Sequence, residues 1–145
     1  MRYFDTSFLL PVFISEEFTS RVERILGQQI PGETLVSEWT RVEFSSALAR
    51  QVRMRTLDQA AASEIERDFE ALVSDTFVTA APTATDFDLA RRFVRRYETG
   101  LRSGDALHLA IASNHGATAI YSLDRGLLRA AQLLGLPVGS VGGLS

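Results

Sequence analysis

Hydrophobic residues along the chain follow two spacings, and their alternation predicts a mixed α/β fold. Short apolar runs are typical of buried strands, and longer runs with a period near 3.6 are typical of helices. The strand-like runs are 2–4, 34–36, 77–79 and 119–122, with a short edge strand expected at 135–138; the helix-like segments are 8–14, 17–29, 38–52, 57–73, 83–97, 103–115 and 125–134. Because strands alternate with helices, we expect a mainly parallel sheet of four to five strands with right-handed crossovers.

The signals at segment ends agree with this division into elements. Ser37 is a predicted N-cap, Thr83 with Asp86 resembles a capping box, and Gly100 is expected to end the helix before it. The chain of 145 residues contains no linker-like stretch. We therefore expect one domain that spans residues 1–145.

The segment from Ser103 to His115 is the most apolar helix that the sequence predicts. Between Ala106 and Ala112 its only polar side chain is His108, so we expect a helix that covers a sheet and is buried on most sides. Asp105 lies in the first turn, close to this core. An ionised carboxylate there costs roughly several kcal/mol unless a cation or strong hydrogen-bond donors satisfy it.

Two further aspartates stand at the carboxyl ends of predicted strands. Asp5 follows the first strand, and Asp124 follows the fourth. In open parallel sheets, ligands bind at this edge. The alternative for Asp5 is purely structural, as the N-cap of the helix that contains Phe8.

Glu43 is the fourth acidic candidate. It lies four residues after Trp39 and four before Ala47, so the three side chains share one helix face. A glutamate between a tryptophan and a small residue is expected to point inward. The alternative is an ordinary surface ion pair with Arg50 or Arg41.

His108, in the middle of the apolar helix, follows Asp105 by three residues and could contact it. A lone histidine on an apolar helix is more often a hydrogen-bonded core residue than a ligand. We expect the core role.

Composition narrows the possible chemistry. The chain has no cysteine, which excludes disulfide frameworks, thiolate metal sites and cysteine nucleophiles. The net charge of −3 gives no general attraction to nucleic acid. All fifteen basic residues are arginine, which fits either a GC-rich genome or phosphate recognition by guanidinium groups. The most basic segment, 83–97, is expected to present a solvated face or a surface for RNA or a second subunit.

No apolar run reaches the length that spans a bilayer, and the first residues do not form a signal peptide. We therefore expect a cytoplasmic protein that has no membrane partner.

In the predicted fold, four carboxylates meet at one edge of the sheet. Asp5 and Asp124 emerge there, and helices that begin on the same side bring Glu43 and Asp105 within reach. Without a cation these groups would repel one another, and some would stay protonated. Carboxylates without His or Cys partners suit Mg²⁺ or Mn²⁺, and such a site binds phosphate oxygens and activates a water. The sequence therefore predicts metal-dependent hydrolysis of a phosphodiester.

Four short motifs occur in order along the chain: Asp5-Thr6-Ser7, Ser37 through Glu43, Ser103-Gly104-Asp105-Ala106-Leu107-His108-Leu109-Ala110, and Ser122-Leu123-Asp124. Together they resemble the PIN domain family and, within it, the VapC-type toxins of bacterial toxin–antitoxin pairs. The resemblance covers essentially the whole chain. It implies a three-layer α/β/α domain and a ribonuclease dependent on Mg²⁺ or Mn²⁺ that cuts single-stranded regions of RNA.

The resemblance also implies roles for individual residues. The family's acidic site, with its metal-binding and catalytic groups, maps onto Asp5, Glu43, Asp105 and Asp124. Contacts to the substrate or to the metal-binding groups are implied for Thr6 or Ser7 and for Ser122. Three arginines that lie beside acidic motifs are the expected phosphate contacts: Arg41, Arg102 and Arg125.

One departure from the family concerns the second metal. Many relatives carry a further acid shortly after the fourth one, whereas Arg125-Gly126 follow Asp124 here. We therefore expect one tight metal site in the free protein.

A homodimer and a cognate VapB-like antitoxin are also implied by the resemblance. The C-terminal segment of the antitoxin would lie along an apolar groove and block the site. Candidates for that groove are Phe8, Leu9, Val12 and Phe13, for which ordinary core packing is the alternative.

Two other functions fit an α/β domain with clustered acids. One is a catalytically inactive binding module that acts through protein contacts. The other is a receiver-like phosphoacceptor domain, which requires an acceptor aspartate after the middle strand and a lysine late in the chain. Here the strand at 77–79 is followed by Ala80-Ala81, and the chain has no lysine.

Overall fold

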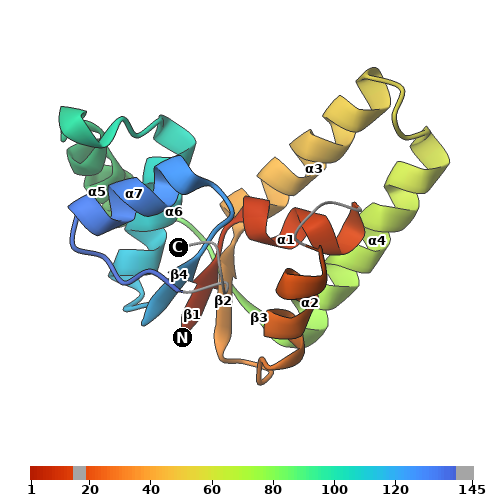
Figure 1. The fold of residues 1–145 in the computed structure, drawn as a ribbon, viewed down its shortest axis with the longest axis horizontal. Coiled ribbons are helices and arrows are strands. Elements are labelled where there is room, and N and C mark those ends of the chain that lie inside the picture. Colours follow the sequence, from red (N-terminus) through yellow and green to blue (C-terminus); the bar gives the residue numbers. More distant parts are fainter. Residues whose placement is uncertain (15–18, 140–145) are drawn as a thin grey trace.

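Four parallel strands form the centre of the molecule (Figure 1). The computed structural model describes residues 1–14 and 19–139. Within them the strands lie in the order β3-β2-β1-β4, and every pairing is parallel. Their bounds are β1 (Arg2–Phe4), β2 (Thr34–Ser37), β3 (Phe77–Ala80) and β4 (Ala119–Tyr121). The predicted α/β fold with a parallel sheet is confirmed.

Helices cover both faces of the sheet (Figure 1). In the described residues they are α1 (Thr6–Phe13), α2 (Thr19–Gly27), α3 (Glu38–Arg53), α4 (Gln59–Thr76), α5 (Ala84–Val94), the short 3₁₀ helix η1 (Tyr97–Thr99), α6 (Ser103–Asn114) and α7 (Arg125–Leu133). Neighbouring strand residues point to opposite faces. Tyr3 packs with α5, α6 and α7, whereas Phe4 packs with α1, α2, α3 and α4. The result is the expected three-layer α/β/α arrangement.

The most buried helix is α6, as its composition predicts. Every residue from Ala106 to Ala112 is buried. On the opposite face of the sheet, the core is built from aromatic rings: Phe44 of α3 stacks on Phe69 of α4 at 3.8 Å between ring centroids, and the edge of Phe13 meets both.

Two predicted elements differ from those observed. The helix expected to reach Tyr97 ends at Val94, because the backbone tightens into η1 and then turns at Gly100, whose φ of +66° is accessible to glycine. The edge strand expected at 135–138 is reduced to a single parallel bridge between Ile120 and Val138. The expected start of the second helix at residue 17 lies outside the described residues, in which α2 begins at Thr19.

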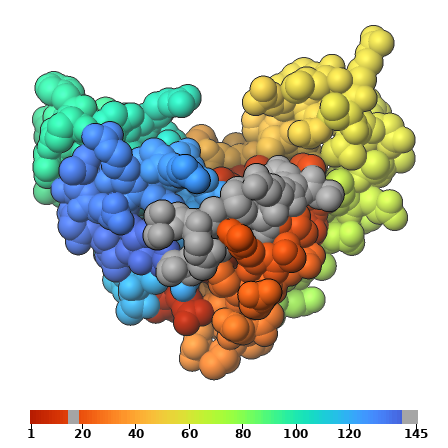
Figure 2. Space-filling model, in the orientation of Figure 1, coloured from red at the N-terminus to blue at the C-terminus, as the bar shows by residue number. Residues whose placement is uncertain are grey.

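A hollow separates the part of the molecule formed by α5, α6 and α7 from the outer ends of α3 and α4 (Figure 2). The carboxyl ends of the strands lead into α1, α3 and α7 on this side (Figure 1). This connectivity places the ends of β1, β2 and β4 where a ligand could approach.

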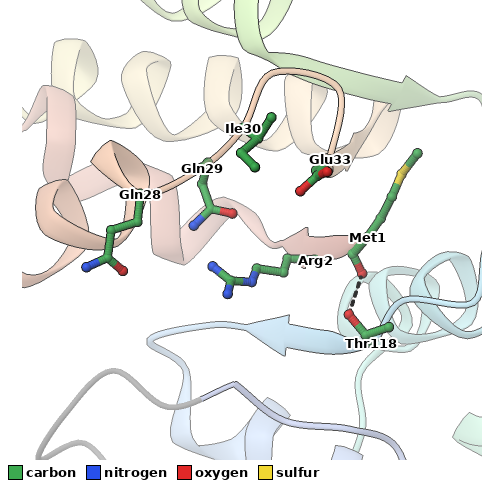
Figure 3. A pocket seen from close by; sticks show the side chains of 7 residues that line it. All are labelled: Met1, Arg2, Gln28, Gln29, Ile30, Glu33 and Thr118. Carbon is green, nitrogen blue, oxygen red and sulfur yellow. Dashed lines mark hydrogen bonds between the residues drawn. The ribbon is translucent and has the colours of Figure 1, made fainter.

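The opposite edge of the sheet contains a separate pocket of about 460 Å³ (Figure 3). It lies at the amino ends of β1, β2 and β4, and the carbonyl of Met1 accepts a hydrogen bond from Thr118 Oγ1 at 3.2 Å on its wall. The lining residues are Met1, Arg2, Gln28, Gln29, Ile30, Glu33 and Thr118. None of them is a predicted site residue, so this pocket is distinct from the candidate active site.

Among the described residues, no helix combines the length and the apolar character that a membrane crossing requires.

The stacked pair Phe44 and Phe69 is expected to carry much of the stability of the α3–α4 side. Replacing Phe44, which is fully buried, with alanine should lower the free energy of unfolding by about 3–5 kcal/mol, because a large cavity replaces the ring. Urea denaturation followed by circular dichroism measures this. The control is Val42→Ala on the same helix, which is 58% exposed and should change stability by less than about 0.5 kcal/mol. Equal effects of the two substitutions would contradict the packing argument.

Candidate active site

The first strand delivers Asp5 to the carboxyl edge of the sheet, where it is 4% exposed. Its Oδ1 caps α1 by accepting the Phe8 N–H at 3.0 Å and also accepts from Ser7 Oγ at 2.8 Å. Its Oδ2 accepts from Ser122 Oγ at 2.7 Å. Asp5 is therefore the structural N-cap of α1 and, at the same time, a buried acid at the end of a strand.

Ser7 and Ser122 form a small network around this carboxylate. Their hydroxyl oxygens are 3.0 Å apart, and Ser7 Oγ also accepts the N–H of Leu123 at 2.9 Å. Ser122 Oγ accepts the N–H of Asp124 at 3.0 Å. The two serines thus connect the ends of β1 and β4.

Glu43 points inward from α3, as its position beside Trp39 predicts. Its Oε1 accepts hydrogen bonds from Thr6 Oγ1 at 2.6 Å and from His108 Nε2. The alternative of a surface pair with Arg50 or Arg41 is wrong, because Glu43 pairs with His108, and Arg41 pairs with Glu38 and Glu70, each at 2.8 Å.

Helix α6 approaches Glu43 closely at Gly104, where any larger residue would be tightly packed. A Cβ there would lie 3.3 Å from Glu43 Oε2 and 3.3 Å from Trp39 Cζ2. The Trp39 indole N–H is buried and has no hydrogen-bond partner among the described residues.

The remaining two acids come from the starts of helices. Asp105 is half-buried in the first turn of α6, and among the described residues no hydrogen-bond donor reaches its carboxylate. Asp124 is exposed and caps α7, with its Oδ1 accepting the N–H groups of Gly126 at 2.9 Å and Leu127 at 3.2 Å.

Electrostatics distinguish these carboxylates. Burial raises the pKa of Asp5 against the lowering effects of the His108 charge and its hydrogen-bond donors. Burial also raises the pKa of Asp105, and the charges of Asp124 and Glu43 raise it further, against the opposing effects of His108 and Arg102. Burial opposes ionisation of Glu43 as well, but the hydrogen bond and charge of His108, with the bond from Thr6, lower its pKa overall. Asp105 is therefore an acid whose ionised form a nearby cation would stabilise.

The donor set suits a hard divalent cation, since it consists of carboxylate oxygens. Asp105 has no competing donor among the described residues, and both hydrogen bonds to Glu43 are accepted by Oε1, so Oε2 remains available. In the part of the chain that the structure describes, no three His, Asp or Glu side chains already converge as closely as metal ligands do. A metal would therefore have to draw these carboxylates together.

The predicted phosphate contacts fall into two groups. Arg41 is committed to Glu38 and Glu70 on the outer side of α3 and α4. Arg102 and Arg125 are exposed at the starts of α6 and α7, beside Asp105 and Asp124. Only the second group is positioned beside the acids.

Two of the residues predicted to line an antitoxin groove do not reach the surface. Phe8 and Leu9 are 0% exposed and belong to the core formed with α2, α3 and α4. That prediction is wrong for them, because α1 turns these side chains toward the sheet. Val12 and Phe13 are half-buried against the same core.

His108 is the residue whose connection to the acids sequence reasoning missed. It is a buried, hydrogen-bonded core residue, as expected, but its partners are Glu43 and the Tyr3 hydroxyl rather than Asp105. The sequence did indicate that His108 lies near the acids, because it is on the same apolar helix as Asp105. A link to residues 3 and 43 could not be read from spacing.

Comparison with solved structures gives the same fold. VapC20 from Mycobacterium tuberculosis, a sarcin–ricin loop cleaving toxin, is 19% identical with a TM-score of 0.73, over 90% of this chain and 95% of that chain. FitAcB from Neisseria gonorrhoeae is 16% identical with a TM-score of 0.67, over 99% of each chain. VapBC-1 from nontypeable Haemophilus influenzae is 12% identical with a TM-score of 0.67, over 97% of this chain and 98% of that chain. A search of curated proteins gave no match.

The sequence pattern of the PIN domain matches residues 2–133, which includes all four strands and all four acids of the site. The chain belongs to the PIN domain family.

Proposed function

We propose that this protein is a metal-dependent endoribonuclease and the toxin of a type II toxin–antitoxin pair, acting in the cytoplasm on single-stranded regions of RNA. The observation that carries the proposal is the half-buried carboxylate of Asp105. It lacks a hydrogen-bond donor among the described residues and lies beside the charges of Glu43 and Asp124. The likeness in fold to a toxin that cleaves the sarcin–ricin loop supports RNA as the substrate class.

The acids that would hold Mg²⁺ or Mn²⁺ are Asp5, Glu43, Asp105 and Asp124. PIN-domain nucleases generally use divalent metal ions, and such an ion supplies a Lewis acid for phosphate oxygens and a more acidic bound water. The remaining contribution comes from the chain itself, which fixes its acids before substrate arrives. Serine hydroxyls fix Asp5, and Thr6 with His108 fixes Glu43.

The two exposed arginines beside the acids, Arg102 and Arg125, would contact phosphates that flank the cleaved bond. Contacts of this kind position a nucleic acid without reading its sequence. Arg41 is a weaker candidate for this role, since its guanidinium is already neutralised by two carboxylates.

Two protein partners belong to the proposal. The likeness in fold to VapBC-1 supports a VapB-like antitoxin that blocks the acidic site. A homodimer is supported by an exposed apolar surface on α5 and η1, where Phe87 is 52%, Val94 36% and Tyr97 84% exposed. This surface adjoins an open cavity of about 590 Å³ that Phe87, Val94, Trp39 and Leu107 help to line. Contiguous exposed apolar area of this kind is typical of protein interfaces.

The nuclease proposal is tested with Asp105→Asn. Loss of this carboxylate should lower the rate of RNA cleavage in Mn²⁺ or Mg²⁺ by about 100-fold or more, because a metal ligand contributes several kcal/mol of transition-state stabilisation. Purified protein free of antitoxin is incubated with total cellular RNA, and discrete products are quantified. EDTA should abolish cleavage, and Asp88→Asn on exposed α5 should leave it unchanged.

Absence of cleavage with every metal, together with absence of Mn²⁺ binding, would refute the nuclease proposal. The acidic cluster would then be structural, and the chain would act as a binding module through protein contacts.

Asp105→Asn should also stabilise the metal-free protein at pH 7. The folded protein holds the pKa of Asp105 above its ordinary value of 3.8, so the ionised form destabilises the fold and the substitution removes that cost. We expect a rise in Tm of roughly 1–3 °C, kept small by solvent screening of a half-exposed group. As pH falls through the raised pKa toward 3.8, wild-type Asp105 takes up a proton and the difference should vanish. Thermal melts of both proteins in EDTA, at pH values from about 7 down to about 3.5, measure this difference in Tm. A Tm increase from Asp105→Asn that becomes larger toward low pH would contradict this explanation.

The homodimer is tested by placing a charge on the apolar surface. Phe87→Arg should convert a dimer into a monomer, since an unpaired charge at the centre of an interface is costly. Light scattering coupled to size-exclusion chromatography measures the mass. Met54→Arg, at an equally exposed apolar residue (58%) at the end of α3, is the matched control and should leave the dimer intact. A monomeric wild-type protein would refute the dimer.

A further inference from the structure

A line of three side chains from three elements leads from the sheet to the acidic site. The Tyr3 hydroxyl of β1 lies 2.6 Å from His108 Nδ1 on α6, and His108 Nε2 contacts Glu43 Oε1 on α3. Tyr3 is 0% and His108 2% exposed. Water therefore does not compete for these contacts, and each side chain is restrained by the next.

For a neutral His108 imidazole, the chemistry of the three groups fixes the direction of the hydrogen bonds. The Glu43 carboxylate can only accept, so His108 Nε2 must carry a hydrogen to bond it. In a neutral imidazole, Nδ1 is then an acceptor and requires a donor. The Tyr3 hydroxyl is that donor, because burial raises its pKa far above neutrality and keeps it protonated.

The far end of the line is also supported. Ser37 Oγ lies 3.3 Å from the Tyr3 oxygen, and it caps α3, the helix that carries Glu43, by accepting the Thr40 N–H at 3.2 Å. The hydroxyl of Tyr3 is therefore held from two sides. Its position is fixed relative to both α3 and α6.

We propose that Tyr3 is a positioning residue: its hydroxyl holds the His108 imidazole by donating to Nδ1, and His108 held in this way orients Glu43 for binding the metal and the phosphate. Without the hydroxyl, Nδ1 would be a buried acceptor that lacks this donor, and the ring would be free to turn away from its present orientation. The Nε2–H group would then no longer be aimed at the carboxylate, and Glu43 would lose one of its two donors. The consequence for cleavage depends on the proposed nuclease function, whereas the orientation of the imidazole does not.

The first test reads the imidazole directly and needs no enzyme activity. In ¹⁵N-labelled protein without metal, long-range ¹H–¹⁵N spectra near neutral pH should show His108 protonated at Nε2 in the wild type. Tyr3→Phe should move the Nδ1 resonance to that of an acceptor without a donor and weaken the Nε2–H signal, because the ring is no longer held against Glu43. Tyr121→Phe is the matched control, since it removes a hydroxyl from a buried tyrosine on the neighbouring strand that faces the opposite core. It should leave the His108 spectrum unchanged.

The second test reads catalysis in the same variants. Tyr3→Phe should lower kcat by about 10-fold and leave KM nearly unchanged, as is usual for loss of a group that orients a metal ligand. His108→Gln, which retains an N–H donor for Glu43, should be more active than His108→Ala. A merely structural role would give equal losses for the two substitutions.

Wild-type His108 protonated at Nδ1 alone, or at both nitrogens near neutral pH, would overturn the proposal, as would a Tyr3→Phe protein whose imidazole signals and kcat match those of Tyr121→Phe. If no variant or wild-type protein cleaves RNA, the proposed nuclease function fails, and the spectra still decide whether Tyr3 holds the imidazole of His108.

Discussion

Placing ionised carboxylates beside a closely packed core is the constraint on which the rest of this structure depends. Asp5 is buried and Glu43 is partly buried, and an uncompensated charge beside the core costs roughly several kcal/mol, a large share of the stability of a domain. Each of these two acids is therefore surrounded by donors that come from other elements. Ser7 and Ser122 serve Asp5, and His108 serves Glu43.

These compensating contacts also hold the layers together. The Asp5 network joins the ends of β1 and β4, and the Tyr3–His108–Glu43 line joins β1, α6 and α3 across the sheet edge. The hydrogen bonds that stabilise these carboxylates thus also fix the relative positions of the elements that carry them. Asp105 is the exception, since it adds charge without gaining a donor among the described residues. A divalent cation would stabilise the ionised form of Asp105. The charge of this residue therefore links the stability of the fold to the proposed chemistry.

The sequence was sufficient to predict the elements, the parallel sheet and the inward direction of Glu43. Period-2 and period-3.6 spacing reflect which faces are buried, and that is a local property of the chain. The motif around Asp105 and the order of the acids were enough for the resemblance to PIN domains. Local patterns were less reliable where the chain turns for tertiary reasons, as between Val94 and Gly100, and where a strand forms only one bridge, at Val138.

By itself, then, the sequence determined the fold class and the positions of Asp5 and Asp124 at the carboxyl ends of β1 and β4, because strand and helix boundaries follow from residue order. Only the tertiary structure decided how each acid is held. It showed that Glu43 pairs with His108 rather than Arg41, that Phe8 and Leu9 are core residues, and that Tyr3 contacts His108. These contacts join residues up to 105 positions apart, and such distances are set by the packing of whole helices on the sheet, which no local pattern encodes.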